Sequence, residues 1–296
     1  MQTEIERTAG TLPGALLPVD TEEQQPTTSI RPPKGWQLVN VRELWQFREL
    51  IYFFIWRDVK VRYKQTMLGA AWAVLQPLMM MIVFTIFFSR LAGVSSGDLP
   101  YPLFAFAGLL PWTFFASAIA NSGNSVVVQE RLVSKIYFPR LAIPIAAVGA
   151  AAVDFLVAFG MLLVLMAVYG IAPGPGLLLV PLVFAVIFLA ALGVGTLLAA
   201  LNVAYRDFRY VIPFLVQLWM FATPTVYMQP AGASGNLQTL LALNPMTSLI
   251  ATFRAACLGG PIPWAAFGGA TACVVAVCVF GCFYFRRVEA RFADII

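Results

Sequence analysis

The sequence has no histidine and little charge. Of its 296 residues, 11% are charged and 60% are hydrophobic. Soluble domains carry about 25% charged residues, so this chain has less than half of the polar groups that a soluble fold of its length needs. The apolar side chains are therefore expected to face lipid. The absence of histidine excludes the commonest metal ligand and the commonest general acid or base near neutral pH.

Other patterns that carry chemistry are also absent. The cysteines show no paired metal-ligand spacing; they are Cys257, Cys273, Cys278 and Cys282. No G-x-x-x-x-G-K-S/T run is present to hold the phosphates of ATP, and no cluster of acidic residues is present to hold Mg²⁺. The sequence therefore predicts a chain that is not an enzyme and that holds no metal or cofactor by itself.

Six apolar stretches meet or approach the ~20 residues that a helix needs to cross ~30 Å of hydrocarbon. They are Leu68–Phe88, Leu103–Ser122, Leu141–Tyr169, Leu177–Val203, Val211–Tyr227 and Trp264–Phe285. The fifth is marginal in length and contains two prolines. The sequence thus predicts an all-α integral membrane protein with six transmembrane helices within residues 67–296. The tail of residues 1–35, rich in Pro, Thr and Glu, is predicted to be disordered.

Basic residues are concentrated on one side of these spans. All of the 19 Lys and Arg except Arg90 and Arg254 precede the first span or follow the second, fourth and sixth. Because short loops rich in Lys and Arg stay in the cytoplasm, both termini are predicted to be cytoplasmic. The positive net charge is then explained by basic residues on the cytoplasmic side, next to phospholipid headgroups, and does not indicate affinity for nucleic acid.

Residues 36–66 are predicted to form an amphipathic helix at the membrane surface. Within Leu44–Lys64, apolar residues recur at helical spacing among several Arg and Lys, as in helices that lie in the headgroup layer. Such a helix could simply anchor the chain. Alternatively, it could be a cytoplasmic gate that meets an anionic, lipid-linked substrate.

Two cytoplasmic loops mix charged and apolar residues. They are residues 129–140 (QERLVSKIYFPR) and residues 205–210 (YRDFRY). Either could be a solvated loop that obeys the charge rule. Either could also form a short helix that docks in the groove of a partner, and the sequence alone leaves this open.

Residues 230–262, between the fifth and sixth spans, remain apolar. Asn244 can cap a helix, Pro245 suits its first turn and Gly259 suits its end. The helix between them is too short to cross a membrane, so it is predicted to be re-entrant, with Leu237–Leu243 as its opposing arm. Backbone at membrane depth is tolerated where protein or water satisfies it. We expect this segment to shape the outer mouth of a pathway.

Asp154 is the single ionisable residue inside a predicted span. An acid there costs about 2.5–3.5 kcal/mol on insertion scales. It could contact a substrate, relay protons, or accept hydrogen bonds from a neighbouring helix. The last role is the more common one for an isolated carboxylate.

Four long segments together resemble one family. They are WRDVKVRYKQTMLGAAWAVLQPLMMM (Trp56–Met81), FAFAGLLPWTFF (Phe104–Phe115), NVAYRDFRYVIPFLVQLWMFATPTVY (Asn202–Tyr227) and NPMTSLIATFRAACLG (Asn244–Gly259). In this order they resemble the permease subunit of type-2 ABC exporters of polysaccharide and polyol phosphate, which export O-antigen, teichoic acid or capsule. The likeness covers nearly everything after Trp36.

The resemblance implies a homodimer in the bacterial cytoplasmic membrane, bound to two separate ATPase subunits that carry ATP and Mg²⁺. Its substrate would be a lipid-linked polysaccharide. The ATPase would contact Gln129, Glu130, Arg131, Lys135, Arg206, Asp207 and Arg209. The gate helix would meet the substrate headgroup with Arg57, Lys60, Arg62 and Lys64. Aromatic residues would line the polymer channel, which suggests Trp72, Phe84, Phe88, Trp112, Phe115 and Trp219.

Three other interpretations explain less of the sequence. A type-2 ABC exporter of drugs or lipids has a similar skeleton but does not account for the YRDFRY and NPMTSL segments. A membrane enzyme of lipid-linked glycan assembly would need clustered polar catalytic groups. An ion-coupled transporter would be supported by Asp154 alone, without a repeated pair of broken helices.

Overall fold

A computed structural model describes residues 41–64, 69, 71–91, 99–205, 207–225, 243–289 and 292 of the chain. All of these residues belong to the unit Trp36–Ile296. The tail of residues 1–35, predicted to be disordered, lies outside them. The described residues are mostly helical and contain no strand, so the predicted all-α class is confirmed.

Five of the described helices are long and apolar enough to cross a membrane. They are α3 (Ala71–Phe84, continued by the π-helix Thr85–Leu91), α4 (Tyr101–Val128), α6 (Ala142–Val168), α7 (Val180–Ala204, preceded by the 3₁₀ turn Pro175–Leu179) and α11 (Trp264–Glu289). These helices match five of the six predicted spans. They confirm an integral membrane protein with several crossings.

The predicted fifth span corresponds to a shorter helix. α8 (Phe208–Phe221) has 14 residues, or about 21 Å at 1.5 Å per residue, which is less than the ~30 Å of hydrocarbon. The prediction extended this span to Tyr227, and residues 226–242 lie outside the described part. The count of six spans therefore stays a prediction.

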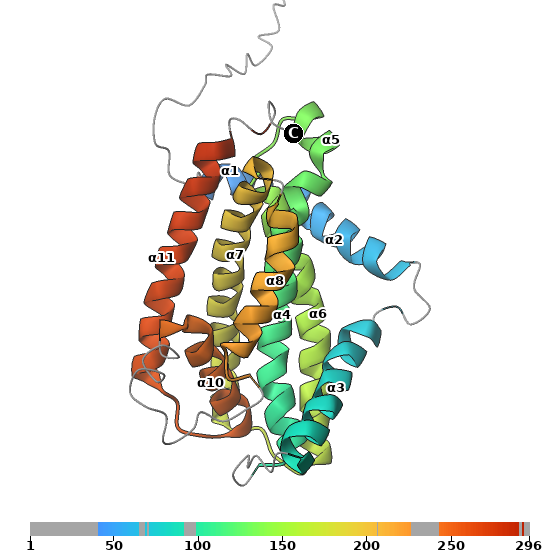
Figure 1. Cartoon of the computed structure of the whole chain (residues 1–296), viewed down its shortest axis with the longest axis vertical. Coiled ribbons are helices and arrows are strands. Elements are labelled where there is room, and N and C mark those ends of the chain that lie inside the picture. Colours follow the sequence, from blue (N-terminus) through green and yellow to red (C-terminus); the bar gives the residue numbers. More distant parts are fainter. Residues whose placement is uncertain are drawn as a thin grey trace, which may run out of the picture. The chain divides into compact units, whose positions relative to one another are not determined.

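α4 lies in the middle of the bundle (Figure 1). It packs along both α6 and α7, and most of its side chains are buried. A polar contact joins it to α7, because the buried Asn202 amide donates to the Gly123 backbone oxygen at 2.9 Å and to Asn124 Oδ1 at 3.1 Å. Such bonds help to select helix partners in lipid, where the surrounding tails are as apolar as the side chains.

α7 and α11 approach each other closely through glycine. A Cβ added at Gly281 would overlap with the backbone oxygen of Gly193, and one added at Gly193 would lie 2.6 Å from the Cα of Cys278. Small residues at a crossing let two helix backbones pack tightly, which is how helices in lipid gain contact.

Replacing Gly281 with Val is expected to destabilise the chain by about 1–3 kcal/mol, the usual cost of forcing extra atoms into a packed contact. The effect is measured as a lower thermal unfolding temperature and less protein in the membrane. Gly268→Val is the matched control in the same helix, because a Cβ at Gly268 meets nothing within 4 Å. Equal losses in the two variants would contradict close packing of α7 on α11.

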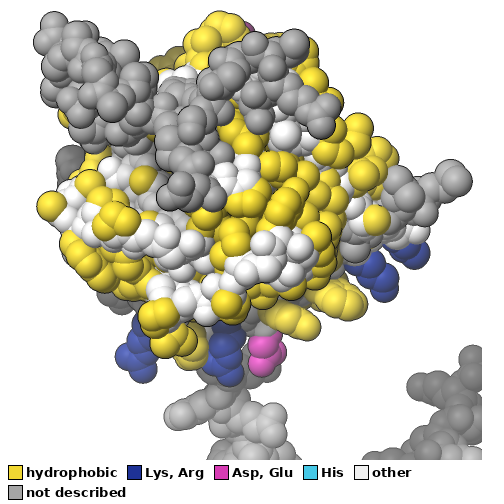
Figure 2. Space-filling model, turned by 90° about the horizontal axis from the view of Figure 1, so that it is seen from below, with side chains coloured by type: hydrophobic (Ala, Val, Ile, Leu, Met, Phe, Trp, Pro, Cys, Tyr) yellow, Lys and Arg dark blue, Asp and Glu magenta, His cyan; other side chains and the backbone are white. Residues whose placement is uncertain are grey.

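The bundle has two different ends (Figure 1). One end carries α1 (Val41–Gln46), α5 (Glu130–Lys135) and the last turn of α11, and the other carries α10 (Pro245–Leu258). Figure 2 shows the α10 end, where hydrophobic side chains cover much of the described surface and a few Lys and Arg appear at the rim. The basic residues of α5 and α11 therefore lie at the opposite end, as the predicted topology requires.

α10 begins and ends where the sequence predicts. Asn244 Oδ1 accepts a hydrogen bond from the Met246 backbone N–H at 3.1 Å, and this is the predicted N-cap. Gly259 ends the helix with a φ of 75°, a left-handed conformation that favours glycine. The 14 residues of α10 are too few to cross a membrane. Of the predicted opposing arm, residues 237–242 lie outside the described part.

Candidate functional site

The helix predicted over Leu44–Lys64 is in fact two helices. α1 ends at Gln46, and α2 (Arg48–Lys64) begins after Phe47. In Figure 1, α2 extends from the side of the bundle at a slant to the spanning helices. This slant distinguishes α2 from a continuation of the first span.

Specific contacts attach α2 to α6 and to the loop before it. Phe54 is buried, and its ring meets the ring of Phe138 edge-on at 5.7 Å. Ile55 lies against Gly149 of α6, where an added Cβ would come within 2.6 Å of the Ile55 side chain. α2 is therefore held against the bundle by protein packing.

The four basic residues predicted for the gate have different surroundings. Arg57 forms an ion pair with its neighbour Asp58 at 2.8 Å. Lys60 and Lys64 are exposed. Arg62 alone reaches into the bundle, where it pairs with Asp154.

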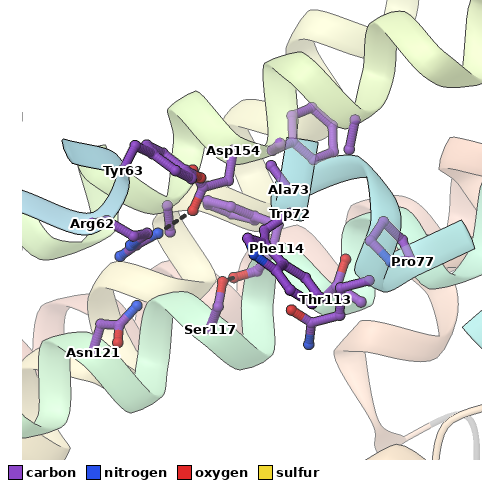
Figure 3. A pocket seen from close by; sticks show the side chains of 14 residues that line it. Arg62, Tyr63, Trp72, Ala73, Pro77, Thr113, Phe114, Ser117, Asn121 and Asp154 are labelled. Carbon is purple, nitrogen blue, oxygen red and sulfur yellow. Dashed lines mark hydrogen bonds and ion pairs between the residues drawn. The ribbon is translucent and has the colours of Figure 1, made fainter. Parts of the chain in front are cut away.

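Asp154 joins α6 to the end of α2 (Figure 3). Its two carboxylate oxygens accept hydrogen bonds from the Arg62 guanidinium and from the Tyr63 hydroxyl. Burial, and then the hydrogen bond to Asp154, raise the pKa of Tyr63 to about 12, so this hydroxyl stays protonated and donates at neutral pH. Of the three roles left open by the sequence, the hydrogen-bonded one fits this geometry. Its partner is the surface helix rather than another span.

A cleft of about 400 Å³ lies beside this contact (Figure 3). α2, α3, α4 and α6 supply its walls. Polar side chains from all four helices line it together with aromatic rings: Arg62, Gln76, Thr113, Ser117, Asn121, Asp154, Trp72, Phe114 and Phe155. Polar side chains between apolar helices are rare because they are costly in lipid, and they commonly mark the pathway of a substrate or an ion.

The sequence contains a pattern that could have predicted this cleft, although the many apolar residues around the pattern obscure it. Thr113, Ser117 and Asn121 are spaced four residues apart in α4. Because residues at i and i+4 share one face of a helix, they form a polar stripe in an otherwise apolar span.

The first three aromatic residues predicted to line a channel lie on or beside α3. Trp72 is 50% exposed and borders the cleft. Phe84 and Phe88 are half-buried, and their rings pack against each other at 5.8 Å. Of these three rings, only that of Trp72 lines the cleft.

The other three aromatic residues are more enclosed. Trp112 and Phe115 of α4 are 2% and 0% exposed, in contact with each other. Trp219 of α8 meets Phe115 edge-on at 5.1 Å and donates its indole N–H to Asn244 at 3.1 Å. In this conformation Trp112 and Phe115 are core residues and present no surface to a channel.

The first predicted ATPase contact contains a short helix, α5. Gln129 lies at the junction of α4 and α5, and Glu130, Arg131 and Lys135 of α5 are exposed. The helix ends at Lys135, and the chain then turns back through Phe138, which is buried. α5 therefore projects charged side chains at the end of the bundle.

The second predicted ATPase contact, residues 205–210, is only partly a loop, because its last residues belong to α8. Tyr205 and Asp207 are exposed, and Arg206 lies outside the described residues. Arg209 belongs to the first turn of α8, which begins at Phe208, so the prediction placed this helix start a few residues too late.

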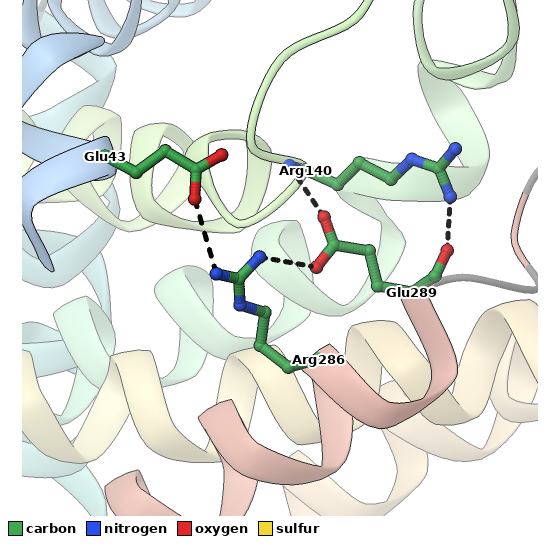
Figure 4. Close-up of polar contacts among 4 residues, drawn as sticks. All are labelled: Glu43, Arg140, Arg286 and Glu289. Carbon is green, nitrogen blue, oxygen red and sulfur yellow. Dashed lines mark hydrogen bonds and ion pairs between the residues drawn. The ribbon is translucent and has the colours of Figure 1, made fainter. Parts of the chain in front are cut away.

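An ionic network fixes the same end of the bundle (Figure 4). Arg286 of α11 pairs with Glu43 of α1 at 3.4 Å and with Glu289 at 3.5 Å. Glu289 also accepts from the Arg140 backbone N–H at 3.1 Å, and its backbone oxygen accepts from the Arg140 guanidinium. α1, the segment after α5 and the end of α11 are thereby tied together. Sequence reasoning missed this network because its members come from distant parts of the chain.

Comparison with known proteins identifies the family. Residues 49–258 match the ABC-2 type transporter family. The O-antigen export system permease protein RfbA of Myxococcus xanthus is 33% identical over 73% of this chain and 82% of its own length. A protein of the same name from Klebsiella pneumoniae is 27% identical over 81% of this chain and 92% of its own length.

Within the described residues, no three His, Cys, Asp or Glu side chains gather in a way that could hold a metal ion. What the bundle does offer is a set of membrane-crossing helices, a polar cleft beside a surface helix, and a charged short helix at one end. These features, together with a match over most of the chain, lead to one conclusion: the chain belongs to the ABC-2 type transporter family and is a membrane-spanning permease subunit.

Proposed function

We propose that this chain is the permease subunit of an ATP-driven exporter that moves a lipid-linked polysaccharide of the O-antigen type across the bacterial inner membrane. The match with O-antigen export permeases over most of both chains carries this proposal. Teichoic acid and capsule are further substrates of the same class, but the names of these relatives favour O-antigen.

The working unit that we propose is a homodimer with two ATPase subunits. The sequence has no ATP-binding loop, so ATP and Mg²⁺ would be held by those partners. α3 and α8 expose apolar side chains that a second copy or lipid can cover, including Met79, Ile82, Phe87, Phe214, Leu218 and Phe221. Both termini, α5 and the segment before α8 would then face the cytoplasm, where the ATPase is available.

Deleting the gene in its source organism tests the proposed function. Long-chain polysaccharide should disappear from the cell surface, and lipid-linked polysaccharide should accumulate in the inner membrane until the gene is restored. Affinity purification of the restored protein should recover an ATPase with a P-loop. Normal surface polysaccharide in the deletion strain would refute the proposal.

Reversing two exposed charges of α5 is expected to uncouple the transporter. Glu130→Lys with Lys135→Glu should lower substrate-stimulated ATP hydrolysis and export by about tenfold, because misplaced like charges at an interface cost a kcal/mol or more. The measurement is ATPase activity and export per copy of permease in membranes. Glu49→Lys, at an exposed position in α2, is the control. Full activity of the α5 variant would count against its role as the docking element.

A further inference from the structure

The polar stripe of α4 presents hydrogen-bond acceptors to the cleft. The Thr113 hydroxyl donates to Leu110 O and the Ser117 hydroxyl donates to Phe114 O, both at 3.0 Å within α4. Each hydroxyl has used its proton on its own helix, so the oxygen lone pairs are left to accept from a ligand. A ligand that donates several hydroxyl protons fits this wall.

Two amide side chains add hydrogen-bond donors as well as acceptors to the cleft. Asn121 continues the stripe on α4, and Gln76 contributes from α3; both are exposed and both line the cleft. An amide offers two donor protons and an acceptor oxygen, so it can bond a hydroxyl group in either direction. Neither amide carries charge, so the ligand portion that they suit is neutral and rich in hydroxyl groups.

An aromatic ring and an ion pair complete the cleft. Trp72 is half exposed at its border and offers a flat apolar face with a polar edge. Asp154 and Arg62 lie at the wall formed by α6 and α2. The Arg62 guanidinium has five N–H donors, of which Nη1 serves Asp154. The volume of about 400 Å³ lies within the range of ~300–1,000 Å³ that small-ligand pockets occupy.

We infer that the cleft between α2, α3, α4 and α6 binds a sugar ring of the substrate. The ring's hydroxyl groups bond to the stripe of α4, to Gln76 and to Asp154, and one apolar face of the ring lies on Trp72. This inference rests on the proposed function, and it deepens it by assigning a saccharide-recognition site beside the surface helix.

An acyl chain is the competing occupant. Lipid tails would offer nothing to the amides of Asn121 and Gln76 or to the free lone pairs of the Thr113 and Ser117 hydroxyls, and unsatisfied polar groups in hydrocarbon are costly. A sugar ring satisfies them. A phospholipid whose headgroup carries hydroxyl groups could form the same hydrogen bonds. The experiment therefore compares a sugar-bearing lipid with such a phospholipid.

The test is a binding experiment on the intact complex with its ATPase subunits, in lipid nanodiscs free of maltoside detergent. The probes are a polyprenyl pyrophosphate that carries one N-acetylhexosamine, the same lipid without sugar, and phosphatidylglycerol. For the unaltered complex, we expect the dissociation constant of the sugar-bearing probe to be about tenfold below that of the sugar-free lipid, as two or more hydrogen bonds would give. Phosphatidylglycerol should not compete.

Three variants test whether the preference for the sugar-bearing probe depends on the cleft. Asn121→Leu and Thr113→Val should each reduce the preference for the sugar-bearing probe by about threefold or more, the share of one hydrogen bond. Thr271→Val is the matched control, because the Thr271 hydroxyl also donates to its own helix, to Phe267 O at 2.8 Å in α11, away from the cleft. Thermal unfolding checks that all three variants are folded.

Each result decides the inference. A preference for sugar that Asn121→Leu and Thr113→Val weaken and Thr271→Val retains supports the site. The inference is overturned if the unaltered complex binds both polyprenyl lipids equally, if phosphatidylglycerol competes equally, or if all variants keep the preference. None of these outcomes touches the proposed function, because the deletion phenotype and recovery of the ATPase test that separately.

Discussion

Replacing Asp154 with Leu is expected to destabilise the permease by about 2 kcal/mol and to reduce export by about tenfold or more. Removing one member of a buried ion pair costs about 3–5 kcal/mol because the other charge loses its partner, and we lower that figure because these side chains are partly exposed. Side-chain exposure is 20% for Asp154 and 32% for Arg62. The measurements are thermal unfolding of the purified complex and surface polysaccharide per copy of permease.

The double variant Arg62→Met, Asp154→Leu separates anchoring from substrate contact. Replacing both members of a buried pair by apolar residues is often neutral or stabilising, so the double variant should unfold near the temperature of the unaltered protein. Export should stay low, because the cleft has lost its carboxylate and its guanidinium. Export that recovered together with stability would show that the pair only attaches α2 to α6.

The sequence predicted the features that local chemistry decides. The spans follow from length and hydropathy, and the limits of α10 follow from Asn244 and Gly259, whose roles depend on the next few residues. The partners of Asp154 could not be predicted in this way. Tyr63 and Arg62 are 91 and 92 residues away in the sequence, so helix packing brings them together.

The orientation of α4 about its own axis explains the main difference between the predicted and the observed candidate site. The aromatic residues of α4 are spread around the helix, so their spacing does not indicate which of them face its neighbours. Trp112 and Phe115 were plausible channel residues by type, yet both are core residues. The stripe that does mark the exposed side of α4 is polar, and it includes Ser117 and Asn121. In a span of this composition, sparse polar residues are more informative than abundant aromatic ones.

Asn244 makes several polar contacts at the start of α10. Its Oδ1 accepts from the Met246 backbone N–H and the Trp219 indole N–H, both at 3.1 Å. Its amide nitrogen donates to Thr223 Oγ1 at 2.8 Å. A second attachment lies further along α10, where the Arg254 guanidinium donates to the Thr225 backbone oxygen at 2.6 Å. One side chain therefore caps α10 and also joins it to α8.

Asn244→Ala is expected to destabilise the chain by about 3 kcal/mol. Loss of an N-cap costs about 1 kcal/mol, and each enclosed polar group left without a partner costs about 1–3 kcal/mol. The group concerned is the Trp219 indole N–H, because the Thr223 hydroxyl keeps its own hydrogen bond to the Trp219 backbone oxygen at 2.8 Å. The drop is measured by thermal unfolding, and Gln217→Ala, at an exposed position of α8, is the control.

Two further variants, Asn244→Asp and Trp219→Phe, show how much of the lost stability comes from each contact of Asn244. A carboxylate still accepts from Met246 and Trp219, and it favours the positive end of the helix dipole, so Asn244→Asp should lose less stability than Asn244→Ala. Trp219→Phe removes the indole N–H that Asn244→Ala would leave unpaired, so the double variant should cost less than the sum of the two single changes. Strict additivity would mean that Asn244 acts as a helix cap alone and that α8 and α10 are held together elsewhere.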